Sequence, residues 1–469
     1  MRPLCVDLDG TLIRSDLLIE SALALLAINP LLLFAMLTWL LRGKAHLKHQ
    51  IALRVELDAT TLPYNEPFIE WLREQRKHRK LILCTASDEK LARSVADHLG
   101  LFDEVIASDG RRNLAGSNKG EILRQLFGER GFDYAGNASI DLLIWKHAAA
   151  AVVVEYGQSL SRAAAKVTVV ERRFEMPRQR LKTWIKALRV HQWVKNILVF
   201  LPLLTSHRVL EIPAVLHSIM AFVCFGLCAS SVYLTNDLLD LPSDRQHHRK
   251  RHRPFAAGML PLQAGPIAAA LLLVAGLSLA WLVSPSFLAV VLGYYVLTTA
   301  YSFRLKRVMM LDVIVLAMLY TTRILAGTEA IHSKPSFWLL AFSMFIFLSL
   351  AMVKRYTELL ALQRSGKVAA SGRGYDVEDI PLIQSLGGSS GYLAVLVLAL
   401  YVDSTASEAL YRHPHRLWML CPLLLYWISR IWAIAHRGVM HDDPVVFAIM
   451  DKMSRVLVLI SAVIVAAAI

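Results

Sequence analysis

Apolar and polar positions follow two different patterns along this chain, and the change falls near residue 180. Before it, short apolar runs of β type alternate with helical patterns; the runs are residues 4–8, 80–87, 103–109, 148–155 and 166–171. Strands that alternate with helices indicate a parallel sheet in an α/β domain. After it, each apolar run is too long and too uniform for a surface helix. The pattern predicts an α/β domain followed by an all-α bundle in a membrane.

Hydropathy predicts about nine transmembrane helices in the second part. They are residues 194–207, 213–235, 263–283, 286–303, 310–329, 336–353, 387–403, 415–435 and 452–469. The connecting segments alternate in charge, and the set that contains residues 236–262 and 354–386 holds most of the Lys and Arg. Because cytoplasmic loops carry this excess, we expect a multi-pass protein of the cell (inner) membrane. Its N-terminal domain and active sites then face the cytoplasm.

Two further segments have a pattern typical of the membrane interface. Residues 176–193 combine cations with Trp184 and apolar residues, which indicates a basic amphipathic helix on an anionic surface, with an ordinary linker helix as the alternative. The chain therefore divides into residues 1–175, 176–193 and 194–469. Residues 23–41 are almost long enough to span, but Asn29 and Pro30 interrupt them. We expect a helical hairpin there, a cap whose apolar face turns toward lipid.

Composition narrows the range of partners. The 469 residues are 55% hydrophobic and carry a formal charge of +14. No nucleic-acid-binding signature is visible, so we attribute the basic excess to cytoplasmic loops and expect no nucleic acid. The five cysteines lie mostly inside apolar runs and are interpreted as buried small hydrophobes. Membrane lipids are expected partners, and a homo-oligomer stays open.

Chemistry in the first part centres on the segment DLDGTL, residues 7–12, which directly follows an apolar strand. Asp7 and Asp9, two residues apart at the end of a strand, can serve as nucleophile and neighbouring acid or base. Gly10 lets the chain turn sharply, and Thr11 can contact a phosphate. A surface turn is the alternative, but three further elements follow in order. Thr85 and Ser87 end a second strand, and Lys119 and Asp141 come later.

Together these elements resemble the haloacid-dehalogenase phosphatase superfamily over residues 1–172. The resemblance implies a Rossmannoid α/β domain with a helical cap. It makes Asp7 the nucleophile, Asp9 the general acid and base, and Thr85 and Lys119 ligands of the phosphoryl group. Asp141 would bind Mg²⁺ together with Asp7 and Asp9. The chain departs from the family at Asn137, where an acid is expected, which removes one carboxylate from the metal site.

Chemistry in the second part centres on NDLLDLPSDR, residues 236–245. Asn236, Asp240 and Asp244 are four residues apart, with Asp237 beside them, so a helix places their oxygens on one face, which Pro242 is expected to distort. Charges at the end of a span are costly unless they line a polar cavity. Clustered oxygen ligands favour Mg²⁺. The basic run 247–253 follows and suits a diphosphate, with a loop that is basic only for topology as the alternative.

This segment resembles a specific signature. Residues 236–258 are similar to the motif NDxxDxxxDR…KRxRPxAxG of the UbiA-type intramembrane transferases, and residues 301–307 with Asp312 are similar to the second cytoplasmic motif of that family. The resemblance covers residues 183–469 and implies a helical bundle whose cavity opens to the cytosol and laterally to lipid. Typical users of prenyl diphosphates have a second aspartate-rich motif for another Mg²⁺, whereas this chain has only Asp312 there.

Four more segments resemble the branch of the decaprenyl-phosphate phosphoribosyltransferases: QWVKN (192–196), KRYTEL (354–359), SGRGYD (371–376) and HDDPV (441–445). In that branch the donor is 5-phosphoribosyl diphosphate and the acceptor a polyprenyl phosphate. The resemblance makes Asp237, Asp240 and Asp244 catalytic ligands of Mg²⁺. With Thr85 and Lys119 of the first part, the expected substrate-binding residues are Lys195, Asn196, Asn236, Arg245, Arg251, Arg253, Tyr301, Lys306, Asp312, Arg323, Lys354, Arg355, Glu358, Arg373 and Tyr375. A snorkelling or topological role is the alternative for each cation.

The fusion of the two parts predicts two consecutive reactions. The membrane part would make polyprenyl-phosphoryl 5-phosphoribose, and the phosphatase part would remove its 5-phosphate to leave polyprenyl-phosphoryl ribose. One alternative is transfer of a polyprenyl group from its diphosphate to an aromatic or other hydrophobic acceptor. The other is a lipid or ion transporter, but the charges gather at the cytosolic ends of the spans and no internal repeat is visible.

Overall fold

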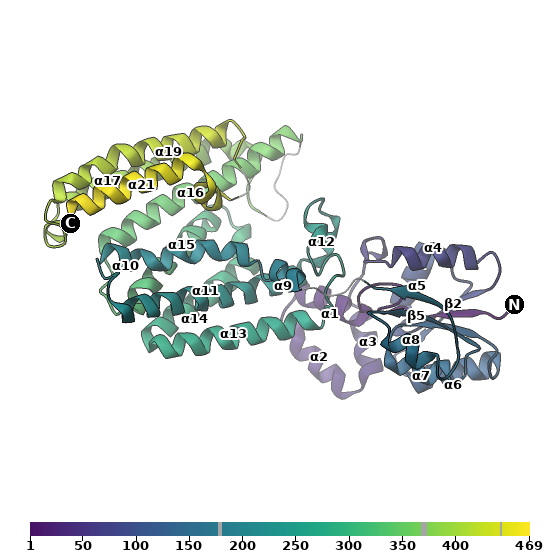
Figure 1. Ribbon diagram of the computed structural model, residues 1–469. Coiled ribbons are helices and arrows are strands. Elements are labelled where there is room, and N and C mark those ends of the chain that lie inside the picture. Colours follow the sequence, from purple (N-terminus) through teal and green to yellow (C-terminus); the bar gives the residue numbers. More distant parts are fainter. Residues whose placement is uncertain (177–180, 367–372, 441–442) are drawn as a thin grey trace. The chain divides into compact units, whose positions relative to one another are not determined.

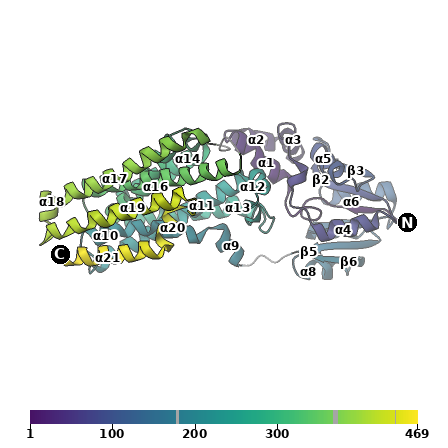
Figure 2. The ribbon, with the colours of Figure 1, turned by 90° about the horizontal axis from the view of Figure 1, so that it is seen from above.

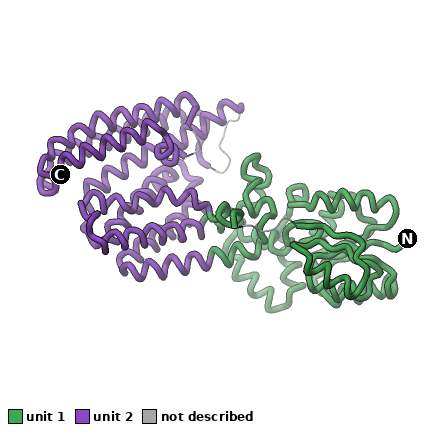
Figure 3. The backbone as a smooth tube through the Cα atoms, in the orientation of Figure 1, with its two compact units in different colours: residues 1–188, 233–269 green, residues 189–232, 270–469 purple. Residues whose placement is uncertain are grey.

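The structure is a computed structural model that describes residues 1–176, 181–366, 373–440 and 443–469. The chain forms two compact units (Figure 3). The first unit comprises residues 1–188 and 233–269, and the second comprises residues 189–232 and 270–469. The first unit therefore includes the segment 236–258 that carries the transferase signature. The division into residues 1–175, 176–193 and 194–469 stays a prediction.

The first unit is built on a parallel sheet of six strands in the order β3-β2-β1-β4-β5-β6 (Figure 1). The strands are β1 (Leu4–Val6), β2 (Leu81–Asp88), β3 (Glu104–Ser108), β4 (Asp133–Gly136), β5 (Ala150–Glu155) and β6 (Val169–Glu175). The predicted α/β domain is confirmed. The sequence pattern missed β4, which has only four residues.

Helices cover both faces of this sheet. Alternate residues of each strand point to opposite sides and pack on these helices. Leu4 and Val6 belong to one buried cluster with residues of α4 (Glu66–Gln75) and α5 (Glu89–Leu99). Cys5 belongs to the other cluster, with residues of α6 (Ser117–Phe127) and α7 (Leu142–Trp145). The short helix α8 (Ser159–Ala164) lies between β5 and β6 in the chain. The central strands β1, β2, β4 and β5 are thereby buried on both sides, as in other parallel sheets, whereas the edge strand β6 contains no buried residue.

A helical cap is inserted between β1 and β2. It consists of α1 (Leu17–Ile28), α2 (Leu32–Leu41) and α3 (Lys44–Ala52), followed by the short 3₁₀ helix η1 (Ala59–Thr61). The predicted break at Asn29 and Pro30 is confirmed, since α1 ends at Ile28 and α2 begins at Leu32. The Asn29 side chain accepts a hydrogen bond from the Leu31 amide and so stabilises the turn.

The rest of the first unit joins this domain to the membrane part. Within residues 176–193, Leu181–Ala187 form α9, and Val190 begins the 3₁₀ helix η3 (Val190–Phe200). Arg189 between them lies in the left-handed region, and residues 177–180 lie outside the described residues. The helices α12 (Leu241–Gln246) and η4 (Lys250–His252) connect α11 (Ile212–Leu239) to α13 (Ala264–Val283). The first unit contains residues 233–269, and hence one end of each of these two long helices.

The second unit is a bundle of helices. After α11 and α13 come α14 (Pro285–Phe303), η5 (Leu305–Arg307), α15 (Leu311–Ala330), α16 (Phe337–Arg364), η6 (Val377–Asp379), α17 (Ile380–Val402), α18 (Thr405–Glu408), η7 (Pro414–Met419), α19 (Leu420–His436), α20 (Pro444–Met450) and α21 (Lys452–Ala468). Figure 2 shows α17, α19 and α21 side by side. The all-α bundle that the hydropathy predicted is confirmed.

Seven helices among the described residues are long and apolar enough to cross a membrane, against about nine expected. Residues 194–207 do not form one span: they divide between the 3₁₀ helix η3 (Val190–Phe200) and α10 (Leu201–Thr205). Here the backbone of Val199 packs directly on Gly327 of α15, at a distance that leaves no room for a side chain. The last predicted span, α21, has 17 residues, which gives it about the shortest length that spans a bilayer.

Candidate active sites

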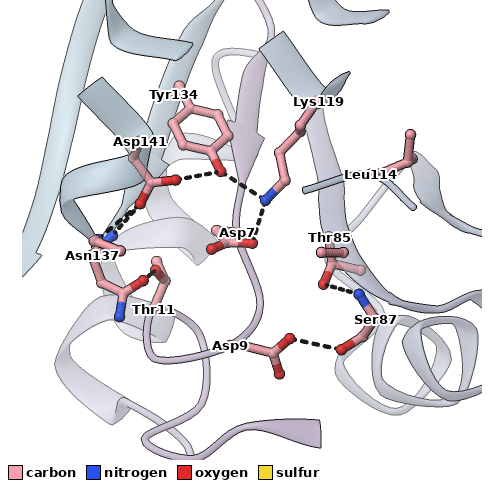
Figure 4. A network of polar contacts seen from close by, with 12 residues as sticks. Asp7, Asp9, Thr11, Thr85, Ser87, Leu114, Lys119, Tyr134, Asn137 and Asp141 are labelled. Carbon is pink, nitrogen blue, oxygen red and sulfur yellow. Dashed lines mark hydrogen bonds and ion pairs between the residues drawn. The ribbon is translucent and has the colours of Figure 1, made fainter. Parts of the chain in front are cut away.

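The first candidate site lies where β1 ends (Figure 4). Asp7 follows β1 directly, and its carboxylate accepts a 2.7 Å hydrogen bond from the ammonium of Lys119, which the start of α6 carries. Lys119 also donates to the Tyr134 hydroxyl at 2.9 Å, and that hydroxyl donates to Asp141 at 3.3 Å. Because parallel strands end at the same edge of a sheet, residues from β1, β4 and α6 meet there. These hydrogen bonds connect the three expected neighbours, Asp7, Lys119 and Asp141, through Tyr134.

The turn after Asp7 brings Asp9 to the end of β2. Gly10 has φ +74°, and a Cβ there would lie 2.1 Å from the Asn137 amide nitrogen, so the turn requires glycine. Asp9 accepts hydrogen bonds from the Ser87 hydroxyl at 2.6 Å and from the Leu17 amide at 2.8 Å. The first bond ties Asp9 to β2, and the second ties it to the first residue of the cap helix α1.

Two carboxyl groups of this site have raised pKa values. Burial, then the charges of Asp16 and Asp7, raises the pKa of Asp9 to about 7. Burial and the charge of Asp7 raise the pKa of Asp141 to about 6. A carboxyl group in that range can give and take a proton near neutral pH, as a general acid and base must. Excess negative charge in a buried cluster is also what a divalent cation would relieve.

Asn137, which stands where the resemblance leads us to expect an acidic residue, accepts a hydrogen bond in this site. Its side-chain oxygen accepts a hydrogen bond from the Thr11 hydroxyl at 3.3 Å. Its backbone amide and that of Ala138 each donate to Asp141 at 2.9 Å. Thr85 is fully buried, and its hydroxyl accepts from the Ser87 amide at 3.0 Å. Thr85 is thus held at the end of β2, the position expected of a phosphate ligand.

The sequence patterns missed one cation of this site, Lys48. It comes from α3 of the cap, and its ammonium donates to the Ala86 carbonyl at 2.5 Å and to the Asn113 side chain at 3.3 Å. Burial lowers its pKa, although Asp9 and Asp16 act in the opposite direction. A lone Lys in a helix of mixed polarity gives no pattern that distinguishes it, so only the fold places it here.

The second candidate site is the segment of the transferase signature. α11 ends at Leu239 and α12 begins at Leu241, yet helical hydrogen bonds cross the break, from the Asp240 amide to Asn236 and from the Asp244 amide to Asp240. Pro242 stands in the first turn of α12, where no amide donor is required. The helix breaks at Asp240 (φ −91°, ψ 8°), two residues before Pro242, so the expected distortion is present, although helical hydrogen bonds cross the break.

Two carboxylates of this segment converge on one guanidinium. Arg253 donates to Asp237 at 3.1 Å and to Asp244 at 2.5 Å. Both carboxylates are buried, and burial raises the pKa of Asp244. The second oxygen of Asp244 is buried without a hydrogen-bond partner. Buried oxygens with unused capacity fit a hard cation such as Mg²⁺. In the part of the chain that the structure describes, no three acidic, Cys or His side chains are gathered as a metal site, so the Mg²⁺ ligands at both sites stay predictions.

Arg245 was expected to bind substrate, and in the structure its guanidinium contacts the cap and the loop after η4. Its guanidinium donates to Glu20 of α1 at 2.6 Å and 3.1 Å and to the Ala256 carbonyl at 3.0 Å. Both side chains of the ion pair are buried. A guanidinium held by three bonds is a structural link between α12 and the cap. Arg251, by contrast, is exposed.

A third group of expected residues meets inside the second unit around Asp312, which is fully buried. One oxygen of Asp312 accepts from Tyr301 at 2.7 Å and from Arg355 at 3.1 Å, and Arg355 also contacts the other oxygen. Arg355 pairs with Glu358 as well, and Arg373 lies 3.6 Å from both carboxylates. Two acids are thus balanced by two guanidinium groups. Asp312 has no oxygen left without a partner.

The remaining expected residues form a second cluster in this unit. Arg323 donates to the Asn196 side chain at 3.0 Å and to the Tyr294 hydroxyl at 3.0 Å. Lys195 forms an ion pair with Asp443, which caps the start of α20. Although burial acts to raise it, the charges of Lys195 and Lys354 lower the pKa of Asp443.

Some expected residues lie at the edge of these clusters. The Tyr375 hydroxyl accepts from the Met310 amide at 2.9 Å and fixes the loop before α15. Lys306 lies half-buried in η5, and Asn236 lies near the end of α11. Of the motifs SGRGYD and HDDPV, residues 371–372 and 441–442 lie outside the described residues.

Comparison with known proteins assigns the second part of the chain to a family. The profile of the UbiA prenyltransferase family matches residues 198–449. This chain belongs to the UbiA prenyltransferase family. The uncharacterized protein y4nM of Sinorhizobium fredii is 37% identical over 459 residues, which cover 96% of this chain and 88% of that protein. Most of the N-terminal α/β domain is therefore shared with that relative.

Two shorter relatives match a smaller share of this chain. Nodulation protein NoeC of Azorhizobium caulinodans is 37% identical over 283 residues, 59% of this chain and 90% of that protein. Decaprenyl-phosphate phosphoribosyltransferase of Mycobacterium tuberculosis is 31% identical over 281 residues, 59% of this chain and 90% of that protein. The homology to this transferase that the motifs predicted is confirmed. The resemblance of the first part to haloacid dehalogenases fits its capped parallel sheet and stays a prediction.

Proposed function

We propose that this chain transfers 5-phosphoribose from 5-phosphoribosyl diphosphate to a polyprenyl phosphate, and that its N-terminal domain then removes the 5-phosphate. The observation that carries the first step is the homology to decaprenyl-phosphate phosphoribosyltransferase over 90% of that protein. The full occupation of Asp312 by Tyr301 and Arg355 supports the choice of donor. A prenyl-diphosphate user requires a second metal site near that position, and Asp312 is committed to an ion pair.

In the transfer step, Asp237, Asp240 and Asp244 would hold Mg²⁺, which neutralises charge on the departing diphosphate. The bond between the ribose C1 and the diphosphate oxygen breaks, and a phosphate oxygen of the lipid forms the new bond to C1. Arg253, which contacts Asp237 and Asp244, supplies a further positive charge at this point. Because charge develops on the leaving group, fixed cations lower the barrier without reorganisation.

In the second step, the carboxylate of Asp7 attacks the 5-phosphate, and the bond from phosphorus to the ribose oxygen breaks. Asp9, with its raised pKa, protonates that oxygen and then takes a proton from the water that hydrolyses the aspartyl phosphate. Lys119, which contacts Asp7, would bind the phosphoryl oxygens. Asp7 and Asp141 would hold the Mg²⁺ of this site, whereas the carboxyl group of Asp9, also predicted as a ligand, is needed as the acid and base. Polyprenyl-phosphoryl ribose and inorganic phosphate are the products.

The test uses the purified full chain in lipid nanodiscs with Mg²⁺, a polyprenyl phosphate and 5-phosphoribosyl diphosphate labelled in the ribose. We expect labelled lipid with the unmutated protein and none with Asp237→Asn. The Asp7→Asn variant should accumulate the lipid that retains the 5-phosphate. If Asp7→Asn releases as much lipid-bound ribose as the unmutated protein, the coupling of the two steps is wrong.

A second candidate, prenyl transfer, is favoured by the description of the matched family. The same preparation is therefore given a labelled polyprenyl diphosphate and an aromatic acceptor. Label that moves to the acceptor, with no product from 5-phosphoribosyl diphosphate, would replace our proposal with this one.

A further inference from the structure

The cap of the N-terminal domain carries an apolar face that nothing among the described residues covers. Helix α2 contains no buried residue, although nine of its ten residues are apolar. One side of it, with Leu32, Met36 and Trp39, packs on the small core of the cap. The other side is exposed and consists of Leu33, Phe34, Leu37, Leu40 and Leu41, which we call the α2 face. Exposed apolar patches of this kind mark a binding surface.

We propose that the α2 face inserts into the cytoplasmic leaflet of the bilayer and anchors the cap on the membrane surface. Ten residues make a helix of about 15 Å, half the thickness of the hydrocarbon core, so α2 cannot span. A helix of this length with one apolar side lies in the plane of the interface. The insertion is independent of the reactions proposed above.

Three features of α2 favour lipid over a protein partner. Its one polar side chain, Thr38, donates to the Ala35 carbonyl at 2.7 Å, so no polar group is left to be satisfied in hydrocarbon. Arg42 and Lys44 follow the helix directly and are exposed, where anionic headgroups attract them. No acidic residue lies in the helix to oppose insertion.

The ion pair of Glu20 and Arg245 places the cap at the level of the membrane. Arg245 lies on α12, which begins two residues after the membrane-spanning helix α11 ends at Leu239. Glu20 lies on α1, and only Asn29 to Leu31 separate α1 from α2. A buried contact therefore fixes α1 beside the point where the chain leaves the bilayer. α2 is then within reach of the headgroups.

The consequence is a substrate class for the N-terminal site. The cap also supplies Lys48 and the Leu17 amide to that site. A cap anchored in lipid holds the site over the membrane surface, where phosphate esters carried by lipids are concentrated and soluble ones are not. This consequence rests on the proposed phosphatase activity, whereas the anchoring itself does not.

The test places a fluorescent label at single positions of the full chain in lipid nanodiscs, which leave both membrane faces open to solutes. The five native cysteines are free and buried, so they give a low background, which the unmutated protein measures. Leu37→Cys and Phe34→Cys report on the α2 face. Leu126→Cys is the matched control, since Leu126 on α6 is 56% exposed and Leu37 is 54% exposed.

Nanodiscs of phosphatidylcholine and phosphatidylglycerol are compared with and without brominated acyl chains, and iodide is the aqueous quencher. We expect brominated lipid to lower the signal at positions 34 and 37 about twofold, because an interfacial helix lies at the acyl boundary. The label at position 126 should respond to iodide and not to lipid. Quenching by iodide at position 37 as strong as at position 126 overturns the proposal. Protection at position 37 from both quenchers also overturns it and indicates a protein partner or a second copy.

Discussion

The ion pair between Glu20 and Arg245 gives the sharpest prediction, because it joins α1 to α12 across 225 residues of sequence. The change is Glu20→Ala. The side chains of the pair are 3% and 6% exposed, and two hydrogen bonds connect them. Without Glu20 the guanidinium stays buried and keeps the Ala256 carbonyl as an acceptor. Removal of one partner of a buried pair costs about 3–5 kcal/mol. Because Arg245 keeps one acceptor, we expect a loss of about 3 kcal/mol in the free energy of local opening.

The assay is hydrogen exchange of the purified full chain, followed in peptides from residues 17–28 and 241–246. A loss of ~3 kcal/mol in the local opening free energy speeds exchange about a hundredfold. Arg245→Met leaves the buried carboxylate of Glu20 without its partner, so its effect should be similar to that of Glu20→Ala. The double variant leaves no unpaired charge and should produce a smaller effect than either single variant. The control is Glu89→Ala, which removes a contact to Arg93 of similar length at 2.5 Å, but on the surface. An exposed pair contributes about 0.5 kcal/mol or less.

Two outcomes would refute this reasoning. One is exchange in α1 of Glu20→Ala within about threefold of the unmutated protein, which is the range of a surface pair. The other is an equal effect of Glu20→Ala and Glu89→Ala. Either outcome means that the ion pair is not buried in solution. The contact that holds α1 beside the end of α11 is then absent.

Three further predictions concern the N-terminal site. Lys48→Met should lower kcat/KM for the phosphate ester about tenfold or more, since a charged hydrogen bond is lost. Transfer activity should stay unchanged, and the control Lys166→Met, at an exposed position, should keep full phosphatase activity. Asn137→Asp should tighten Mg²⁺ about tenfold in a titration of phosphate release, because it adds a carboxylate beside Thr11. In EDTA, Asp9 and Asp141, with pKa values of about 7 and 6, bind protons more tightly when folded than when unfolded. The unfolding free energy of the domain should therefore rise as the pH falls from about 8 to about 5, and unchanged denaturation curves over that range would contradict the assigned burial.

The N-terminal site was predictable because local rules determine it. A short apolar strand followed by DLDGTL places Asp7 at the carboxyl edge of a parallel sheet, and Lys119 and Asp141 follow other elements that end at the same edge. The structure brings the three into contact through Tyr134. The structure differs from the sequence prediction at positions that local sequence patterns do not determine. β4 contains Asp133 and Gly136 and so shows no apolar run, and Lys48 reaches the site only because α3 of the cap folds back on β2.

The membrane part shows the same division between local and long-range determinants. Apolar length predicted most spans, but residues 194–207 divide between η3 and α10, and Gly327, more than a hundred residues later, admits the backbone of Val199 there. The motif NDLLDLPSDR keeps its helical register, as its spacing predicted. The fate of its last residue was not predictable, since Arg245 pairs with an acid in a different part of the chain.

The two acidic motifs of the transferase part differ in what surrounds them, and this difference bears on the number of metal ions. Asp237 and Asp244 share one guanidinium, and an oxygen of Asp244 has no hydrogen-bond partner. Asp312 has two guanidinium groups and a hydroxyl around it, so a cation there would have to displace a buried ion pair. Displacement leaves Arg355 buried with Glu358 as its remaining acidic partner, and it costs free energy because a buried ion pair is broken. The sequence indicated one aspartate cluster from the number of acidic residues, and the contacts of Asp312 give a physical reason why a second metal ion is disfavoured there.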